Sequence, residues 1–96
     1  MNKPKTSKPK TKRVIFKVIA EPGNKVCLAG SFNNWDPAGK EMTDPKGTGV
    51  FAVTLTLAPG TYEYKFVING TWCVDPECAE WAQNSLGTLN SVRKVE

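Results

Sequence analysis

The sequence predicts a small all-β domain, an antiparallel β-sandwich of the immunoglobulin-like kind with a disordered basic N-terminal tail. Three observations predict it. Apolar and polar residues alternate from residue 14 onward, no segment carries the 3.6-residue stripe of a helix, and turn residues recur about every 8–12 positions. With 96 residues the chain holds one domain at most. A chain of this size buries only about 60% of its unfolded surface, so a shallow binding face is easier to build than a deep cleft.

The tail differs from the rest of the chain in composition. Residues 1–13 hold six lysines and arginines and no acid, whereas the remaining residues hold seven basic and nine acidic side chains. The net charge of +4 therefore belongs to the tail. Because this segment has no apolar residue beyond Met1, we expect disorder over 1–13 and a folded domain over 14–96. The tail is either a solubilising or tethering arm, or a contact for an anionic partner.

The first half of the domain predicts two strands and a long connection. Residues 14–19 alternate in polarity, and Glu-Pro-Gly-Asn at 21–24 ends that strand with turn chemistry. A second short apolar strand is expected at 25–30. The connection over 31–49 is rich in Asn, Asp, Pro, Gly and Lys and holds at most a short strand near 40–43.

The second half predicts further strands of the same kind. Residues 49–57 and 61–68 alternate, and Ala-Pro-Gly separates them. Asn69-Gly70 is a strong hairpin signal, so 71–74 should fold back as a partner strand. Residues 75–86 read as a loop with one helical turn at most, and 88–95 as the last strand.

The three cysteines, Cys27, Cys73 and Cys78, are odd in number, and no secretory signal follows Met1. We therefore expect a reducing compartment, the cytoplasm. Cys27 lies in an apolar run and is expected in the core. The spacing of Cys73 and Cys78 allows a link between them, but the chain offers no fourth ligand for a zinc site.

Several function classes are disfavoured by composition. The chain has no histidine, which excludes Ser-His-Asp and Cys-His nucleophiles and His-containing zinc sites. No apolar run approaches the ~20 residues of a membrane helix. A carboxylate pair for glycoside hydrolysis would come from loops, where acids usually serve turns. The candidates are Asp36, Asp44, Asp75, Glu77 and Glu80. We expect no enzyme, no metal, no cofactor and no membrane or nucleic-acid partner.

The three tryptophans fall at loops and strand edges. Trp35 lies in a polar loop, Trp72 follows the Asn-Gly turn, and Trp81 lies within 75–87. Each could cap an end of the core or lie open for stacking. A glucose ring has an apolar face of C–H groups that an indole can cover, and a rim of hydroxyls that suits lysine and amide side chains. Trp35, Trp72, Lys65 and Asn90 would form such a set if they met on one face, although periodicity alone favours a solvated Lys65.

Several motifs together resemble the glycogen-binding module of the AMP-activated protein kinase β subunit, in carbohydrate-binding module family 48. They are Gly30-Ser-Phe-Asn-Asn-Trp-Asp-Pro37, Pro59-Gly-Thr-Tyr-Glu-Tyr-Lys-Phe-Val-Ile-Asn-Gly-Thr-Trp72, Asp75-Pro76 and Leu86-Gly-Thr-Leu-Asn-Ser-Val92. The likeness covers about residues 14–95 in the same order. It implies an early-set β-sandwich that binds α-1,4-linked glucan without catalysis.

The resemblance also implies roles for single residues. The stacking tryptophans of the family fall on Trp35 and Trp72, its hydrogen-bonding lysine on Lys65, and its leucine finger on Leu86. The threonine and asparagine that follow fall on Thr88 and Asn90. The segment 75–85 departs from the kinase pattern and leads into Leu86. Trp81 either packs beneath this segment or widens the sugar-binding surface, and we expect packing.

The resemblance implies partners as well, namely an α-glucan and a glycogen-metabolising enzyme or kinase complex. An alternative function is a regulatory or scaffold module whose basic tail makes the contacts. The chain shows nothing of the C-terminal partner-binding region of the kinase subunit, which counts against that alternative.

Overall fold

The computed structural model of the chain describes residues 11–96. Seven strands and no helix occur in this described part, so no helix there could cross a membrane. The strands are β1 (Lys12–Ile19), β2 (Val26–Gly30), β3 (Val50–Leu57), β4 (Gly60–Ile68), β5 (Thr71–Cys73), β6 (Trp81–Gln83) and β7 (Leu89–Val95).

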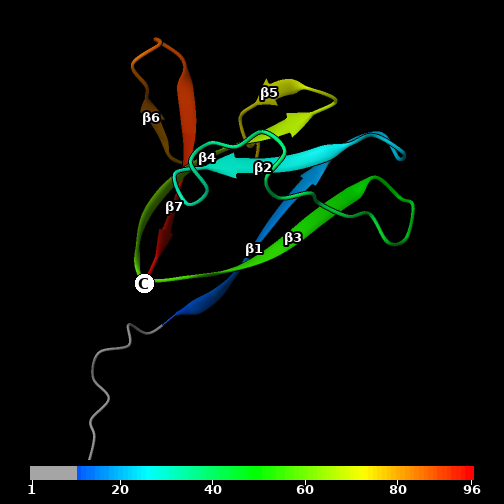
Figure 1. The fold of residues 1–96 in the computed structure, drawn as a ribbon, viewed down its shortest axis with the longest axis horizontal. Coiled ribbons are helices and arrows are strands. Elements are labelled where there is room, and N and C mark those ends of the chain that lie inside the picture. Colours follow the sequence, from blue (N-terminus) through cyan, green and yellow to red (C-terminus); the bar gives the residue numbers. More distant parts are fainter. Residues whose placement is uncertain (1–10) are drawn as a thin grey trace, which may run out of the picture.

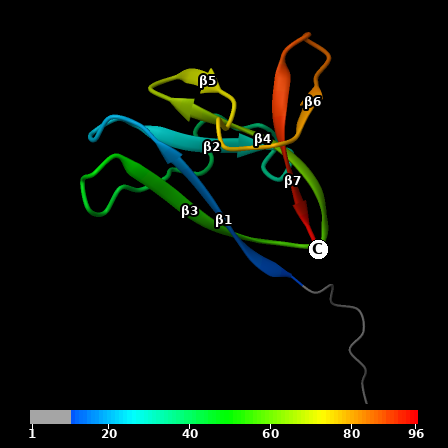
Figure 2. The ribbon, with the colours of Figure 1, turned by 180° about the vertical axis from the view of Figure 1, so that it is seen from behind.

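The strands form two antiparallel sheets, as the sequence predicts (Figures 1 and 2). One sheet is the pair β1–β3. The other has the order β2-β4-β7-β6, and β5 pairs with the end of β4 on the edge opposite β2. In both views β6 and the first part of β7 project away from the β1–β3 pair. The larger sheet therefore has an inner face toward β1–β3 and an outer face away from them.

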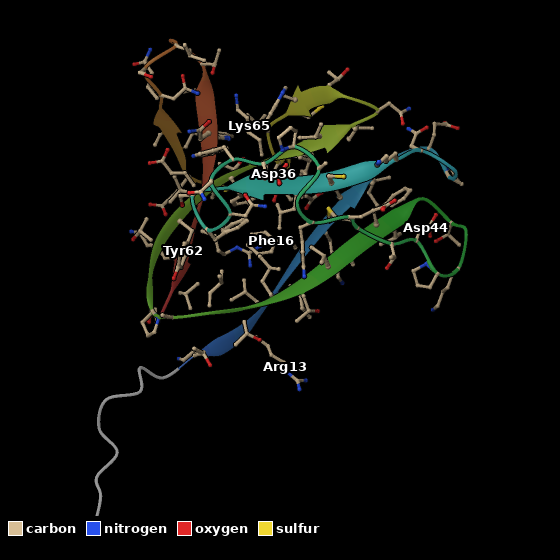
Figure 3. All side chains as sticks on the ribbon, in the orientation of Figure 1. Arg13, Phe16, Asp36, Asp44, Tyr62 and Lys65 are labelled. Carbon is tan, nitrogen blue, oxygen red and sulfur yellow. The ribbon has the colours of Figure 1, made fainter. Side chains whose placement is uncertain are left out.

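The core lies between the two sheets and follows the predicted alternation. In β1 every second residue is buried, and Phe16 packs edge-on against Tyr64 of β4 with ring centroids 4.9 Å apart. Figure 3 shows Phe16 between the sheets and Lys65 on the other side of β2. Since side chains alternate along a strand, burying Tyr64 and Phe66 turns Lys65 to the outer face.

Near residues 40–43, where at most a short strand is expected, there are two isolated bridges, from Glu41 and from Thr43. Two details differ from the expectation. β1 begins at Lys12, two residues before the predicted start, because Lys12 and Arg13 pair with the end of β3. The loop expected over 75–86 contains β6. The disorder predicted for the tail falls largely on residues 1–10, which lie outside the described residues.

A buried polar contact ties the 75–80 loop to the core. The Tyr64 hydroxyl donates to Asp75 Oδ2 at 2.7 Å, and the Asp75 N–H donates to Ser91 Oγ at 2.8 Å. All three residues are at most 5% exposed. Burial, and then the hydrogen bond to Asp75, raises the pKa of Tyr64 well above its usual value.

Replacing Tyr64 with phenylalanine should lower the free energy of unfolding by about 1–3 kcal/mol, because the Asp75 carboxylate then loses a partner while it stays buried. Urea unfolding at pH 7 measures this. The wild-type protein should also lose stability above about pH 10, where only the unfolded state gives up the tyrosine proton. That loss should be smaller in Tyr64→Phe, and equal slopes in both proteins would contradict the assignment.

Candidate functional site

The outer face of the larger sheet carries a hollow of about 590 Å³. Residues from four places along the chain line it: the loop after β2, the middle of β4, β5, and the β6–β7 hairpin. They are Trp35, Lys65, Trp72, Asn84, Ser85, Leu86, Thr88 and Asn90. We call this the outer hollow.

The β4–β5 hairpin places Trp72. Asn69 and Gly70 both have positive φ, 50° and 84°, as the Asn-Gly turn signal predicts. The turn sets the register so that Trp72 lies opposite Val67. Directly paired residues point to one face, so the indole of Trp72 lies on the same side as Lys65. It is 44% exposed, which leaves one part of the ring for a ligand.

The loop after β2 places Trp35. Asn34 and Trp35 both have a φ of 58°, in the left-handed region that few residues other than glycine adopt. The Trp35 N–H donates to the Gly30 carbonyl at 2.9 Å. Asn33 donates through Nδ2 to the Leu28 carbonyl and accepts from the Gly30 N–H. These bonds to β2 hold the strained turn.

Trp35 rests on a small second cluster on the outer face, made of Cys27, Ala29 and Val67. This packing leaves it half-buried, unlike the more open Trp72. Cys27 is buried as predicted, and burial raises the pKa of its thiol. Cys73 and Cys78 are also free, so the structure shows no link between them.

Lys65 supplies the single charge of the outer hollow. Its Nζ donates to Thr88 Oγ1 at 3.2 Å, which joins the centre of β4 to the β6–β7 hairpin. An ammonium has three donors, so this bond orients the group and leaves donors for a ligand. Among the residues that line the hollow, none is acidic. The lining therefore suits a neutral polar ligand better than a polyanion, which would need several cations.

Asn84 organises the hairpin and was not singled out in the sequence. Its Oδ1 accepts from the N–H groups of Leu86 and Thr88, at 2.9 and 3.1 Å. Its Nδ2 donates to Thr88 Oγ1 and to Asn90 Oδ1. One side chain thus fixes the turn and aligns two predicted site residues. The available signal was an Asn three residues before a Gly, which is typical of a turn.

Leu86 lies at the tip of that turn and is 86% exposed. Gly87 follows with a φ of 82°, which allows the chain to reverse directly after it. A large apolar side chain held this far into solvent by a hydrogen-bonded turn has no core to pack on. It is available to a ligand in the outer hollow.

Asn90 lines the same hollow but is only 5% exposed. Its Nδ2 donates to Glu63 Oε1 at 2.9 Å, and its Oδ1 accepts from Asn84. Asn90 therefore holds Asn84 in place and has little surface left for direct contact. All six residues singled out from the sequence line this hollow.

Trp81 differs from the expectation. It begins β6 and is 52% exposed, so the prediction that it packs beneath the 75–85 loop is wrong. Asp75, not Trp81, anchors the loop to the core, and the loop ends where β6 begins at Trp81. Trp81 is not among the residues that line the outer hollow.

Three of the five acidic residues considered for catalysis, Asp36, Asp44 and Asp75, serve local structure. Asp44 accepts from the N–H groups of Thr48 and Gly49, and Asp36 accepts from Ala38. Such bonds are the usual role of Asp in turns, as predicted. The described residues contain no group of three or more Cys, Asp or Glu side chains that could hold a metal ion.

A larger hollow of about 690 Å³ lies elsewhere, between β1 and the 75–80 loop. No tryptophan lines it. Half of its lining residues are aliphatic, including Ile15, Ile19 and Val50, and five are charged. Size alone would favour it as a ligand site. The outer hollow combines two indoles with amide, hydroxyl and ammonium groups. Because of this combination of groups, we regard the outer hollow as the candidate ligand-binding site.

Comparisons with known proteins point to one family. The family model described as the glycogen recognition site of AMP-activated protein kinase matches residues 15–96. The β-1 subunit of 5'-AMP-activated protein kinase from Sus scrofa is 34% identical over 74 residues, which are 77% of this chain and 57% of that protein.

Two plant proteins are also similar. FLOURY ENDOSPERM 6, chloroplastic, from Oryza sativa is 38% identical over 64 residues, 67% of this chain and 12% of that protein. PTST homolog 2, chloroplastic, from Arabidopsis thaliana is 43% identical over 53 residues, 55% of this chain and 10% of that protein. The chain thus spans less than two thirds of the length of each of these relatives.

Proposed function

This chain belongs to the family of glycogen recognition sites of AMP-activated protein kinase, and on that premise we propose that its outer hollow binds α-1,4-linked glucan without changing it. Glycogen, starch and maltooligosaccharides are the proposed ligands. The observation that carries the proposal is that Trp35, Trp72 and Lys65, which lie far apart in the sequence, line one hollow.

Stacking supplies most of the proposed affinity. The apolar C–H face of a glucose unit covers an indole, and burying such area stabilises a complex by about 25 cal/mol per Å². Trp72 and Trp35 offer two such surfaces in one hollow, and Leu86 offers a third apolar contact from the hairpin. An α-1,4-linked chain is curved, so successive rings can touch surfaces that a straight chain cannot reach together.

Polar groups supply orientation. The ammonium of Lys65 and the hydroxyl of Thr88, which already bond to each other, reach the rim of the hollow beside the amide of Asn84. Sugar hydroxyls both donate and accept, so they fit such a mixed set. Because the site is open and its contacts are few, we expect a dissociation constant on the order of micromolar to millimolar.

A direct test compares four polysaccharides on affinity gels and by calorimetry. Glycogen and amylose should retard the protein, whereas cellulose and xylan, whose chains are β-linked and straighter, should not. Retardation by all four alike would show a general affinity for sugar surfaces and would contradict an α-glucan site.

The alternative function, a scaffold whose basic tail contacts an anionic partner, makes a different prediction. Binding through six cationic side chains would weaken steeply as salt is raised, because bound counterions are released. Binding through the outer hollow, with its single lysine, should change little between 50 and 500 mM salt. Retention on glycogen beads at both salt concentrations distinguishes the two.

We also propose partners and a location for the module. We propose that the module serves a glycogen-metabolising enzyme or a kinase complex, since kinase subunits are among its relatives. We also propose a reducing compartment, the cytoplasm, because all three cysteines are free. The two plant relatives are chloroplastic by name.

A further inference from the structure

The exposed Trp81 lies in a short strand with a defined register. β6 pairs with β7 so that Trp81 lies opposite Ser91, and Gln83 lies opposite Leu89. Directly opposed residues share a face, and residues two apart on one strand do so as well. Trp81, Gln83 and Leu89 therefore lie on the same side of the β6–β7 hairpin. We call these three residues the reverse patch.

The reverse patch lies opposite the outer hollow. Ser91 also pairs with Tyr64, whose ring belongs to the core between the sheets. Trp81 and Ser91 thus belong to the inner face. Asn90, one residue away from Ser91, lines the outer hollow. The hairpin presents one set of side chains to each side.

The second sheet does not cover the reverse patch. In Figures 1 and 2 the hairpin extends past the β1–β3 pair, so its inner face has no strand opposite it. The exposed fractions agree: Trp81 is 52% and Leu89 is 46% exposed, whereas Ser91, lower on the same face, is fully buried. An indole and a leucine are thereby left in solvent at diagonal positions of the same hairpin face.

We propose that the reverse patch is a second α-glucan contact, so that one module holds two chains of the polymer, one on each side of its hairpin. This proposal rests on the proposed function of the outer hollow. Trp81 would stack on a sugar ring, Leu89 would extend the apolar surface, and the amide of Gln83 would bond the sugar hydroxyls.

The size and chemistry of the reverse patch favour a sugar over a protein partner. A stable protein interface involves about 20–30 residues a side, whereas the patch has three residues on a two-stranded ribbon. A single sugar ring needs one indole and an amide, which the patch supplies. None of its three side chains is charged, so the patch offers no ion pair to a charged ligand.

A second contact matters because glycogen and starch present many chains at once. When the first chain is held in the outer hollow, a neighbouring chain is supplied to the reverse patch at a high effective concentration. Weak second contacts of this kind raise retention on a polymer more than affinity for a short oligosaccharide.

The test follows the indole N–H signals of the full-length protein, labelled with ¹⁵N, during titration with maltoheptaose. Single Trp→Phe variants assign the three signals. We expect the Trp81 signal to shift with a midpoint at least about threefold weaker than that of Trp35 and Trp72. In Trp72→Ala the Trp81 signal should still shift. A Trp81 signal that stays still while the other two move would overturn this proposal and leave the proposed function intact.

A polymer assay measures the consequence. Trp81→Ala should weaken retention on glycogen beads by about tenfold and leave the affinity of the outer hollow for maltoheptaose unchanged. Ile19→Ala, which removes a 71% exposed residue of β1, is the matched control and should change neither. Equal retention of wild type and Trp81→Ala would overturn the proposal. So would a dimer in sedimentation velocity that Trp81→Ala returns to a monomer, because a second copy would then occupy the patch.

Discussion

Replacing Trp72 with alanine is expected to weaken binding of maltoheptaose in the outer hollow by roughly seventy-fold while the protein stays folded. The indole is 44% exposed and rests on an outer face, so its removal opens no hole in the main core. If a bound sugar covers about 100 Å² of it, the loss is about 2.5 kcal/mol, or roughly seventy-fold in affinity. A millimolar interaction would then be undetectable, whereas a micromolar one would remain measurable at its weaker value.

Quenching of tryptophan fluorescence and calorimetry measure the effect, and circular dichroism with thermal unfolding shows that the fold persists. Trp72→Phe is the matched control: it keeps a smaller aromatic surface and should retain part of the affinity. An unchanged affinity in Trp72→Ala would contradict the proposal that a sugar ring stacks on Trp72.

Replacing Asn84 with alanine is expected to weaken glucan binding by about tenfold or more, although we assign Asn84 no stacking role. The substitution removes the acceptor for the Leu86 and Thr88 N–H groups and the donor to Thr88 and Asn90. Each lost bond contributes about 1 kcal/mol, and the turn that presents Leu86 would lose its geometry. Since the hairpin is exposed, global stability should fall by no more than about 2 kcal/mol.

The variant Asn84→Asp separates the two roles of this side chain. Aspartate keeps an oxygen acceptor for the two backbone N–H groups and loses the amide donor. If the turn matters most, Asn84→Asp binds nearly as well as wild type; if the bonds to Thr88 and Asn90 matter most, it resembles Asn84→Ala. Calorimetry with maltoheptaose distinguishes them. Wild-type affinity in Asn84→Ala would show that the turn does not need this residue.

The longer strands and the all-β class could be predicted because their signals are local. Alternation over residues 14–19 of β1 predicts which side chains face the core, and the Asn-Gly turn before β5 predicts the hairpin that follows. The alternation of residues 61–68 likewise predicts that Lys65 lies on the face opposite Tyr64 and Phe66. That Trp35 meets Lys65 and Trp72 in one hollow came from the family resemblance, since no local pattern brings together residues this far apart.

The short strand β6, the side on which Trp81 lies and the role of Asn84 depend on contacts that a local sequence pattern does not reveal. β6 has three residues, too few for alternation to be recognised, and exists because β7 offers it an edge. Without that strand the side on which Trp81 lies could not be assigned. The role of Asn84 likewise depends on bonds to residues four and six positions away, which form only when the hairpin closes.

The central claim is that Trp35 and Trp72 act together as one surface for a curved glucan, and their indole N–H signals test it most directly. On titration with maltoheptaose, both signals should shift with one common midpoint, and cellohexaose at the same concentrations should move neither. Signals that stay still with maltoheptaose, that move with different midpoints, or that respond equally to both oligosaccharides would contradict the claim.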